Sequence, residues 1–468
     1  MTALIEKTVL ARRRRLEAPV LAEARALAVL AGPLILTQLA QMAVMTTDVI
    51  LLGRFSRAAL AAAAIGNTIY FAAWLLGSGP AFAVAPMIAQ TLGLNPADKV
   101  QVRATVRMGL WSVLIAALPL MGLMWMARPI LLVAHQSPRL AAMAAQFVGV
   151  VALGLPFALG YQVLRGFMMA LSRPHPGMWV MAATILINGV VGYALIFGHF
   201  GAPRLGIVGS GTATALSALF SFAAMAAIAL TDPQMKAYRV LRRFARPALS
   251  TLGELYRLGL PIGLTLIFEA MLFNVMTLVM GSFGTASLAA HQIALNVASI
   301  TFMVPLGLGM AATVRVGLAA GAGDSRGVRR SGFTAVAMGL SFIVVCGAAM
   351  ALWGAPIAGL YVGGRAAQDL EVIAMAALFL KVAAAFQVFD ALQVVAGQSL
   401  RGLKDARAPM FIAGGAYWLA GAPTCLILAF GFGLKGLGVW IGLAVGLAVA
   451  AAALFARFAI LTRRPEVL

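Results

Sequence analysis

Twelve long apolar runs constrain this chain more than any other feature of its sequence. Crossing the hydrocarbon core of a bilayer, about 30 Å thick, takes about 20 helical residues. Runs of that length recur along all 468 residues, separated by short charged or Gly/Pro-rich segments. They lie near residues 27–52, 59–90, 108–127, 140–164, 178–200, 206–230, 258–282, 286–318, 331–353, 370–400, 410–430 and 436–460.

The composition excludes a soluble domain, because 62% of the residues are apolar and only 10% are charged. A membrane β-barrel would need segments of about 10 residues with alternating polarity. The runs in this chain are continuously apolar and rich in Ala, Leu and Gly. The sequence therefore predicts an all-α polytopic membrane protein with twelve transmembrane helices.

The placement of the 35 Lys and Arg residues predicts the orientation and excludes nucleic acid as a partner. With a cytoplasmic N-terminus, 27 of them fall in inner segments, Lys381 falls within a span, and seven fall in outer loops. No basic stretch is interleaved with aromatic residues that could stack on bases. We expect a multi-pass membrane protein with both termini cytoplasmic, in which Arg12–Arg15 and the 236–257 loop contact anionic lipid. The seven outer cations are Arg54, Arg57, Arg128, Arg139, Arg204, Arg365 and Lys435.

The second half of the sequence repeats the first. An offset of 228 residues superposes Pro33 on Pro261 and Gly53 on Gly281, among other pairs. Six spans per half is an even number, so we expect two six-helix lobes related by a pseudo-two-fold axis along the membrane normal. The predicted parts are a cytoplasmic segment 1–26, an N-lobe 27–230, a cytoplasmic linker 231–257, a C-lobe 258–460 and a cytoplasmic tail 461–468.

Three carboxylates, Asp48, Glu269 and Asp390, lie well inside apolar runs. An acid at the centre of a membrane helix costs about 3 kcal/mol, so such residues usually face the bundle interior and bind something. The alternative is a neutral, hydrogen-bonded acid with a structural role. Three such acids, each on a helix with polar neighbours, favour a functional site.

The polar neighbours of these acids recur at helical spacing, which places them on common helix faces. Such faces would line a cavity or pack against one another, and only a cavity explains ionisable groups beside the amides. The faces comprise Gln38, Gln41 and Asp48 on the first span; Thr265 and Glu269 on the seventh; Gln292, Asn296 and Ser299 on the eighth; and Phe386, Gln387, Asp390 and Gln393 on the tenth.

A buried carboxylate can hold a proton, a metal cation or an organic cation, but hardly two of these at once. Such competition is the basis of antiport, provided that binding differs between two facing states. The sequence contains no P-loop, no nucleophile elbow and no paired Cys or His, so neither an enzyme nor an ATP-driven pump has a candidate site. We expect no cofactor, and H⁺ or Na⁺ as the coupling ion.

Long stretches of the sequence resemble the multidrug and toxic compound extrusion (MATE) transporters, and within them the NorM-like bacterial branch. The resemblance covers nearly the whole chain. It is carried by TTDVILLG at 46–53, FGAPRLGIVGSGTATA at 200–215, GLPIGLTLIFEAMLF at 259–273, AAHQIALNVASITFMVPLGLGMAATVRVG at 289–317 and FDALQVVAGQSLRGLKD at 389–405.

The resemblance implies twelve helices in two lobes and export of small organic cations and drugs in exchange for protons or sodium ions, by a protein expected to act as a monomer. It assigns Glu269 and Asp390 to cation binding in the C-lobe, where sodium is one candidate ion. It assigns Asp48 to the N-lobe, with Asn188 and Thr214 as polar partners.

Two residues depart from the family pattern. Gly192 stands where relatives often carry Asn or Asp, and Phe386 replaces a frequent tyrosine. Each change removes an oxygen, and sodium, a hard cation, needs several. Protons are therefore favoured over sodium.

Three other functions fit the sequence less well. A lipid-linked oligosaccharide flippase of the same superfold would be expected to have a more basic cavity. A membrane-embedded enzyme would need a nucleophile, a metal or an acid pair on facing helices. A channel suits two halves with unequal acids less well than a gated carrier does.

Overall fold

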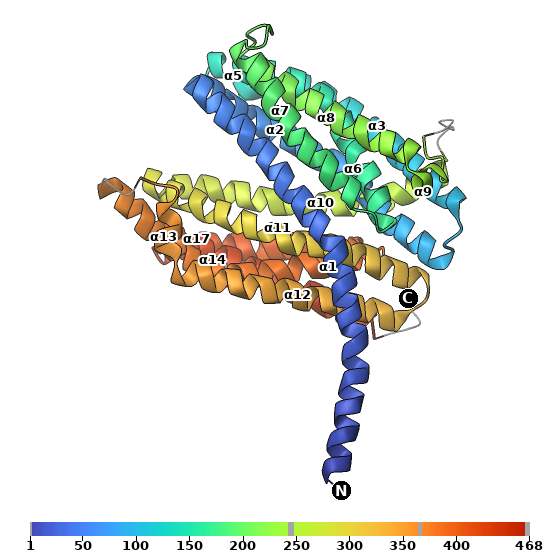
Figure 1. Ribbon diagram of the computed structural model, residues 1–468. Helices are drawn as coiled ribbons and strands as arrows, with labels where there is room; N and C mark the ends of the chain where they lie inside the picture. Colours follow the sequence, from blue (N-terminus) through green and yellow to red (C-terminus); the bar gives the residue numbers. More distant parts are fainter. Residues whose placement is uncertain (1, 242–247, 364–366, 464–468) are drawn as a thin grey trace. The chain divides into compact units, whose positions relative to one another are not determined.

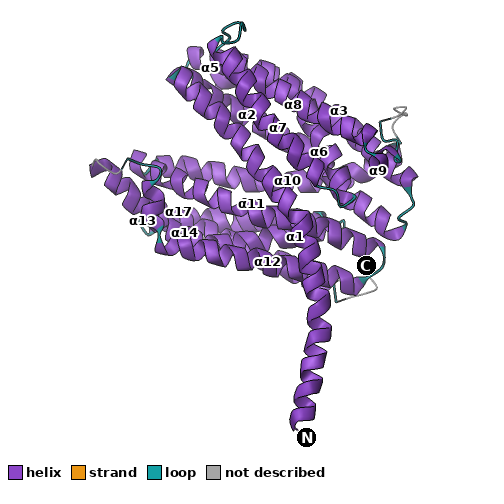
Figure 2. Cartoon of the chain, viewed as in Figure 1, coloured by secondary structure: helices purple, strands orange, loops and turns teal. Residues whose placement is uncertain are grey.

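The computed structural model describes residues 2–241, 248–363 and 367–463, and these residues form helices and connecting loops with no strand among them (Figures 1 and 2). Twelve of the helical segments are long and apolar enough to cross a membrane. They correspond one to one with the predicted spans, so the predicted fold class is confirmed. Parts of the predicted linker and tail, residues 242–247 and 464–468, lie outside the described residues.

The first half of the chain contains six of these spans. Its elements are α1 Thr2–Phe55, α2 Arg57–Leu94, α3 Lys99–Trp125, α4 Ala127–Val133, α5 Pro138–Val151, η1 Ala152–Gly154, α6 Leu155–Ala170, α7 His175–Phe197, α8 Ile207–Thr231 and the short α9 Pro233–Lys236.

The second half contains the other six. Its elements are α10 Leu249–Gly281, α11 Thr285–Gly321, α12 Ser325–Leu352, α13 Gly354–Gly359, α14 Ala367–Gly402, α15 Arg407–Gly415, η2 Ala416–Gly421, α16 Ala422–Leu426, η3 Ile427–Gly431 and α17 Lys435–Leu461.

Side-chain caps set where several helices begin, and these positions differ from the ends of the apolar runs. The carboxylate of Asp98 accepts a hydrogen bond from the backbone N–H of Gln101 at 2.9 Å, so α3 begins about two turns before its apolar run. Asp324 caps α12 in the same way, through the N–H of Gly327 at 2.8 Å. Hydropathy locates the apolar centre of a helix, whereas capping groups fix its end.

Two of the spans are not uniform α-helices. The fourth is α5 and α6 joined by the 3₁₀ turn η1, and Pro156 follows this turn. The eleventh alternates α-helical turns with the π-helical segments η2 and η3. A π-helical segment shifts the rotational phase of the helix, and such segments are frequent at functional sites.

The chain divides into two compact units whose borders fall within helices. One unit comprises residues 36–267, and the other comprises residues 1–35 together with 268–468. The borders cut α1 between Ile35 and Leu36, and α10 between Ile267 and Phe268. The residues of α1 up to Ile35 therefore pack with the second half of the chain. The residues of α10 up to Ile267 pack with the first half.

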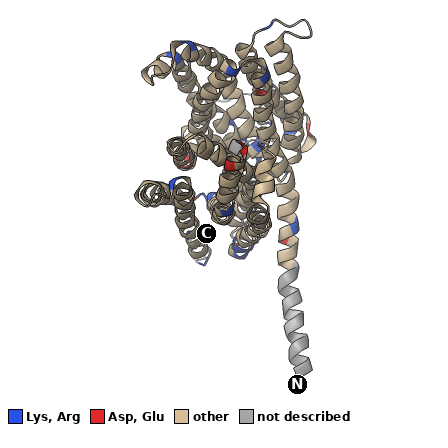
Figure 3. Ribbon diagram, turned by 90° about the vertical axis from the view of Figure 1, so that its left-hand side faces the viewer, with Lys and Arg blue, Asp and Glu red and all other residues tan. Residues whose placement is uncertain are grey.

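Each unit has its own apolar core. In the unit of residues 36–267, α2 packs against α3, α5 and α6, and α7 packs against α8. In the other unit α14 packs against α11, α12 and α17, around the buried rings of Phe386, Tyr417 and Trp440. Figure 3 shows that most of the helical ribbon carries no Lys, Arg, Asp or Glu, as the apolar runs require.

Glycine allows α10 to approach α2 closely. A Cβ added to Gly259 would lie 2.5 Å from the Cα atom of Pro80, whereas one added to Gly253, earlier on α10, would have nothing within 4 Å. Gly259→Ala should therefore lower the thermal unfolding temperature of the detergent-purified protein, because overpacking costs about 1–3 kcal/mol. Gly253→Ala is the matched control and should leave the temperature unchanged or raise it. Equal temperatures for the two variants would contradict this packing.

Candidate functional site

Asp48 lies on α1 in the unit of residues 36–267, and it is 8% exposed. The hydroxyl of Thr214, on α8, donates a hydrogen bond to Oδ2 of Asp48 over 3.0 Å. The same hydroxyl lies 3.1 Å from the carbonyl oxygen of Ser210. A hydroxyl carries one proton, so Thr214 can donate to an ionised Asp48, or turn to Ser210 when Asp48 is protonated.

Asn188, on α7, lies beside Asp48, and we call Asp48, Thr214 and Asn188 the N-terminal acid site. Its side chain is fully buried and interacts with Asp48. At hydrogen-bonding distance, however, neither amide atom of Asn188 has a partner, and neither does Oδ1 of Asp48. A buried polar atom without a partner costs about 1–3 kcal/mol. These atoms form a site that a proton or a cation would satisfy.

Gly192, one turn after Asn188, has little room for a larger residue. A Cβ at this position would lie 3.1 Å from Cδ1 of Leu51 and 3.7 Å from Cβ of Ala213. An Asn or Asp side chain would require Leu51 to move. The packing around Gly192 is therefore built without the additional oxygen.

A second acid site, the C-terminal acid site, lies in the other unit. There Glu269 on α10 and Asp390 on α14 interact electrostatically. Asp390 is 6% exposed, and Glu269 is half-buried. Gln393, one turn after Asp390, lies beside Glu269 and interacts with it. Two carboxylates at close quarters resist being ionised together unless a cation or a proton joins them. The structure thus brings together three of the residues that the sequence predicted for this site.

Two residues of this site, Arg401 and Tyr417, were not among the predicted site residues. Arg401, near the end of α14, interacts with Glu269 and Tyr417. Tyr417 lies in η2 and is fully buried, and its phenol interacts with both acids. The LRG sequence, which occurs at 164–166 and at 400–402, was a signal for the arginine, because it places an arginine at the same point of both halves; Arg165 is buried and Arg401 is half-buried. Tyr417 had no such signal, because its direction depends on the π-helical segment.

Phe386 and Gln387 form the wall of the C-terminal acid site rather than its polar lining. The ring of Phe386 packs edge to face against Phe273 and Trp440, with centroids 6.1 and 5.7 Å away. The amide of Gln387 donates a hydrogen bond to the carbonyl oxygen of Ala298 over 2.7 Å and ties α14 to α11. These contacts hold the α14 turn that precedes Asp390.

The remaining predicted polar residues lie in more open surroundings. Gln41 is half-buried, and Gln292 and Asn296 are exposed. Asn296 accepts a hydrogen bond from the hydroxyl of Tyr361 over 2.9 Å. Thr265 donates to the carbonyl oxygen of Pro261 on its own helix, over 2.8 Å, and belongs to the other unit from Glu269.

Comparison with known proteins identifies relatives along nearly the whole chain. The sequence profile of the MatE family matches residues 33–194 and 261–427. A probable multidrug resistance protein NorM of Mesorhizobium japonicum is 43% identical over 93% of both chains. One of Rhizobium meliloti, with the same description, is 42% identical over 94% of both chains.

Solved structures share the fold. The eukaryotic MATE transporter AtDTX14 superposes with a TM-score of 0.83, 23% identity, and coverage of 96% of this chain and 100% of its own. A MATE protein in complex with MaL6 superposes with a TM-score of 0.85, 18% identity, and coverage of 95% and 97%.

The placement of Tyr417 gives a testable expectation. The hydroxyl of Tyr417 is buried beside the two acids and has no hydrogen-bond partner in the structure, so it is available to donate to a carboxylate that becomes ionised. Tyr417→Phe should therefore weaken binding of the lipophilic cation tetraphenylphosphonium to the purified protein. The expected loss is about tenfold, or about 1.4 kcal/mol, the size of a hydrogen bond to a charged group. Tyr161→Phe is the control, because Tyr161 is equally buried but donates to the carbonyl oxygen of Gly177. Calorimetry that finds equal affinities for the two variants would remove Tyr417 from the site.

Proposed function

Because the chain belongs to the MATE family, we propose that this multi-pass membrane protein exports organic cations and drugs in exchange for protons. The names of its relatives support drug export, and the acids within its spans support the charge of the cargo. Export proceeds by alternating access between two facing states. The excess of Lys and Arg in alternate loops supports cytoplasmic termini in the bacterial inner membrane.

The charge balance around Glu269 and Asp390 is the observation that carries this proposal. Arg401 interacts electrostatically with Glu269, so one of the two acids already has a cation of the protein in its surroundings. Asp390 interacts with Glu269, a group of its own sign. Asp390 therefore needs either a proton or a positively charged ligand, and exchange between the two is the elementary step of antiport.

The same arrangement favours protons over sodium as the coupling ion. A sodium ion at Glu269 would meet the guanidinium of Arg401, and charges of the same sign repel. In the N-terminal acid site, Gly192 supplies no side-chain oxygen, and sodium, a hard cation, needs several. A proton needs one carboxylate oxygen, and Thr214 can turn to Ser210 when Asp48 accepts it.

In the proposed cycle, an organic cation binds from the cytoplasm while the acids are ionised. Protonation from the outer side neutralises the carboxylates, and the cation loses its electrostatic partner and leaves. Release of the protons to the cytoplasm restores the charged sites. The exchange is obligatory only if the empty, ionised protein changes its facing state slowly, because ionised acids without a partner are costly in an apolar bundle.

Ion dependence tests the choice of coupling ion. In everted membrane vesicles, an imposed proton gradient should drive transport of ethidium, and an imposed sodium gradient without a pH difference should not. Addition of a protonophore to the vesicles with the imposed proton gradient should abolish transport. Transport driven by sodium alone would show that sodium is the coupling ion.

Amide substitutions test the acids themselves. Asp48→Asn, Glu269→Gln and Asp390→Asn should each abolish proton-coupled ethidium transport, because an amide cannot exchange a proton, while the amount of protein in the membrane stays at the level of the unmodified chain. Glu371→Gln is the control, since this acid lies exposed near the start of α14. Unaltered transport in all three amide variants would rule out the proposed coupling.

A cargo of opposite charge is an outcome of the same experiments. A lipid-linked oligosaccharide carries an anionic pyrophosphate and would require a surplus of cations at its binding site. In the C-terminal acid site the carboxylates of Glu269 and Asp390 face a single arginine, Arg401. Vesicles that move a lipid-linked anion and no organic cation would favour the flippase.

A further inference from the structure

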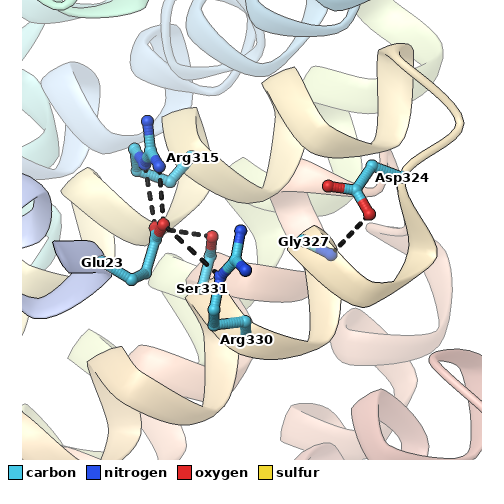
Figure 4. A network of polar contacts seen from close by, with 6 residues as sticks. All are labelled: Glu23, Arg315, Asp324, Gly327, Arg330 and Ser331. Atoms are coloured by element: carbon cyan, nitrogen blue, oxygen red, sulfur yellow. Dashed lines mark hydrogen bonds and ion pairs between the residues drawn. The ribbon is translucent and has the colours of Figure 1, made fainter. Parts of the chain in front are cut away.

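Glu23, on the first half of α1, contacts charged and polar side chains of two other helices in its unit (Figure 4). Its carboxylate accepts two hydrogen bonds from Arg315 on α11, one from Nε at 2.9 Å and one from Nη2 at 2.6 Å. The hydroxyl of Ser331 on α12 donates a third at 2.7 Å. Nε of Arg330, also on α12, lies 3.9 Å away. One side chain of α1 therefore holds two neighbouring helices.

The geometry of this cluster is that of a strong contact. Glu23 is 3% exposed, and the side chains of Arg315 and Arg330 are about one-third exposed. Paired hydrogen bonds between a guanidinium and a carboxylate are among the strongest in proteins. Glu23→Gln removes the charge that these guanidiniums contact and turns the paired hydrogen bonds into weaker neutral ones, so the contact should weaken.

A second contact fixes α1 further along its length. Gly307, on α11, packs so closely against Ile35 that an added Cβ would lie 3.0 Å from the backbone nitrogen of Ile35. Glu23 and Ile35 are 12 residues apart, a rise of about 18 Å along a helix. The segment of α1 from Glu23 to Ile35 therefore contacts α11 at both of its ends.

The remainder of α1 belongs to the other unit. The helix continues without a break from Ile35 to Phe55, and the residues from Leu36 onward, which include Asp48, pack with residues up to 267. A single helix thus carries an anchored segment in one unit and a coupling acid in the other.

Packing at the start of α10 mirrors this arrangement. Gly79, on α2, lies 228 residues before Gly307 and packs against Gly259. The hydroxyl of Tyr256 then donates to the carbonyl oxygen of Ser112 on α3, over 3.0 Å. In each half of the repeat, the first part of the first helix therefore packs with the unit that contains the other half. In α1 this packing includes the ion cluster around Glu23.

We propose that Glu23 is a positioning residue that clamps the first part of α1 to α11 and α12, so that this segment remains with its unit in both facing states. The clamp fixes the position of α1 at Glu23, so that protonation of Asp48 can change the position of the later part of the helix relative to this point. The consequence for transport rests on the proposed antiport function, whereas the clamp itself can be measured without transport.

Distances between spin labels test the clamp directly. The labels go on Ala22→Cys and Ala322→Cys, which are exposed on α1 and after α11, in a background without Cys346 and Cys425. Double electron–electron resonance should give one narrow distance that is the same at low pH, at high pH and with tetraphenylphosphonium bound. Glu23→Gln should replace it with a broad distribution. The proposal would be overturned if the distance changes between these conditions in the labelled chain that retains Glu23. It would also be overturned if the distance stays narrow in Glu23→Gln.

Two controls separate the clamp from general loss of structure. A label pair at Ala322→Cys and Arg407→Cys lies in the same unit without α1, and its distance should stay unchanged in Glu23→Gln. If Glu23→Gln does not fold, Ser331→Ala removes one hydrogen bond, keeps the ion pair, and should broaden the distance to a smaller extent.

Transport then shows whether the clamp serves the cycle. Glu23→Gln should slow proton-driven ethidium transport at least about tenfold while the affinity for tetraphenylphosphonium remains unchanged, because the clamp contains neither candidate acid site. The charge-swapped pair Glu23→Arg with Arg315→Glu should recover part of the rate. Full transport in a variant whose label distance has broadened would reject the role of the clamp in the cycle.

Discussion

The cost of an ionised carboxylate inside an apolar bundle is the constraint on which the candidate sites of this protein depend. Asp48 meets part of this cost with a hydrogen bond from the rotatable hydroxyl of Thr214, and the buried amide of Asn188 lies beside it without a hydrogen-bond partner. Glu269 meets it with an amide and an arginine. Asp390 interacts with another acid and remains the group most dependent on an arriving charge. The two sites therefore differ in chemistry although the halves of the sequence repeat.

Helix α1 connects this chemistry to the architecture. Glu23 and Ile35 fasten its first part to α11 and α12, and Asp48 lies on its later part, in the other unit. In the proposed cycle, a change in charge at Asp48 would act on a helix that is held at Glu23 and Ile35. Repeated glycines at positions 79 and 307 permit the corresponding close packing in both halves. The sequence repeat thus specifies shared packing, while the charged residues make the halves unequal.

Hydropathy and helical spacing, which are local properties, predicted the twelve spans and placed Asp390 and Gln393 on one helix face. The grouping of Glu269 with Asp390 came from the resemblance to the MATE transporters, because the two acids lie on different spans. The sequence did not identify Arg401 or Tyr417 as part of this group. Tyr417 lies in a π-helical segment whose phase no spacing rule gives, and Arg401 was counted as a loop cation. Glu23 was passed over among the acids at span ends, because its arginine partner is 292 residues away.

Proton release on cation binding tests the central claim, that protons and organic cations compete for the same carboxylates. The purified protein, in weakly buffered solution with a pH indicator, would be titrated with tetraphenylphosphonium at a pH where transport is active. The account predicts that binding releases protons, and that Asp390→Asn releases fewer. Saturable binding of the cation with no release of protons at any pH between 5 and 9 would contradict it.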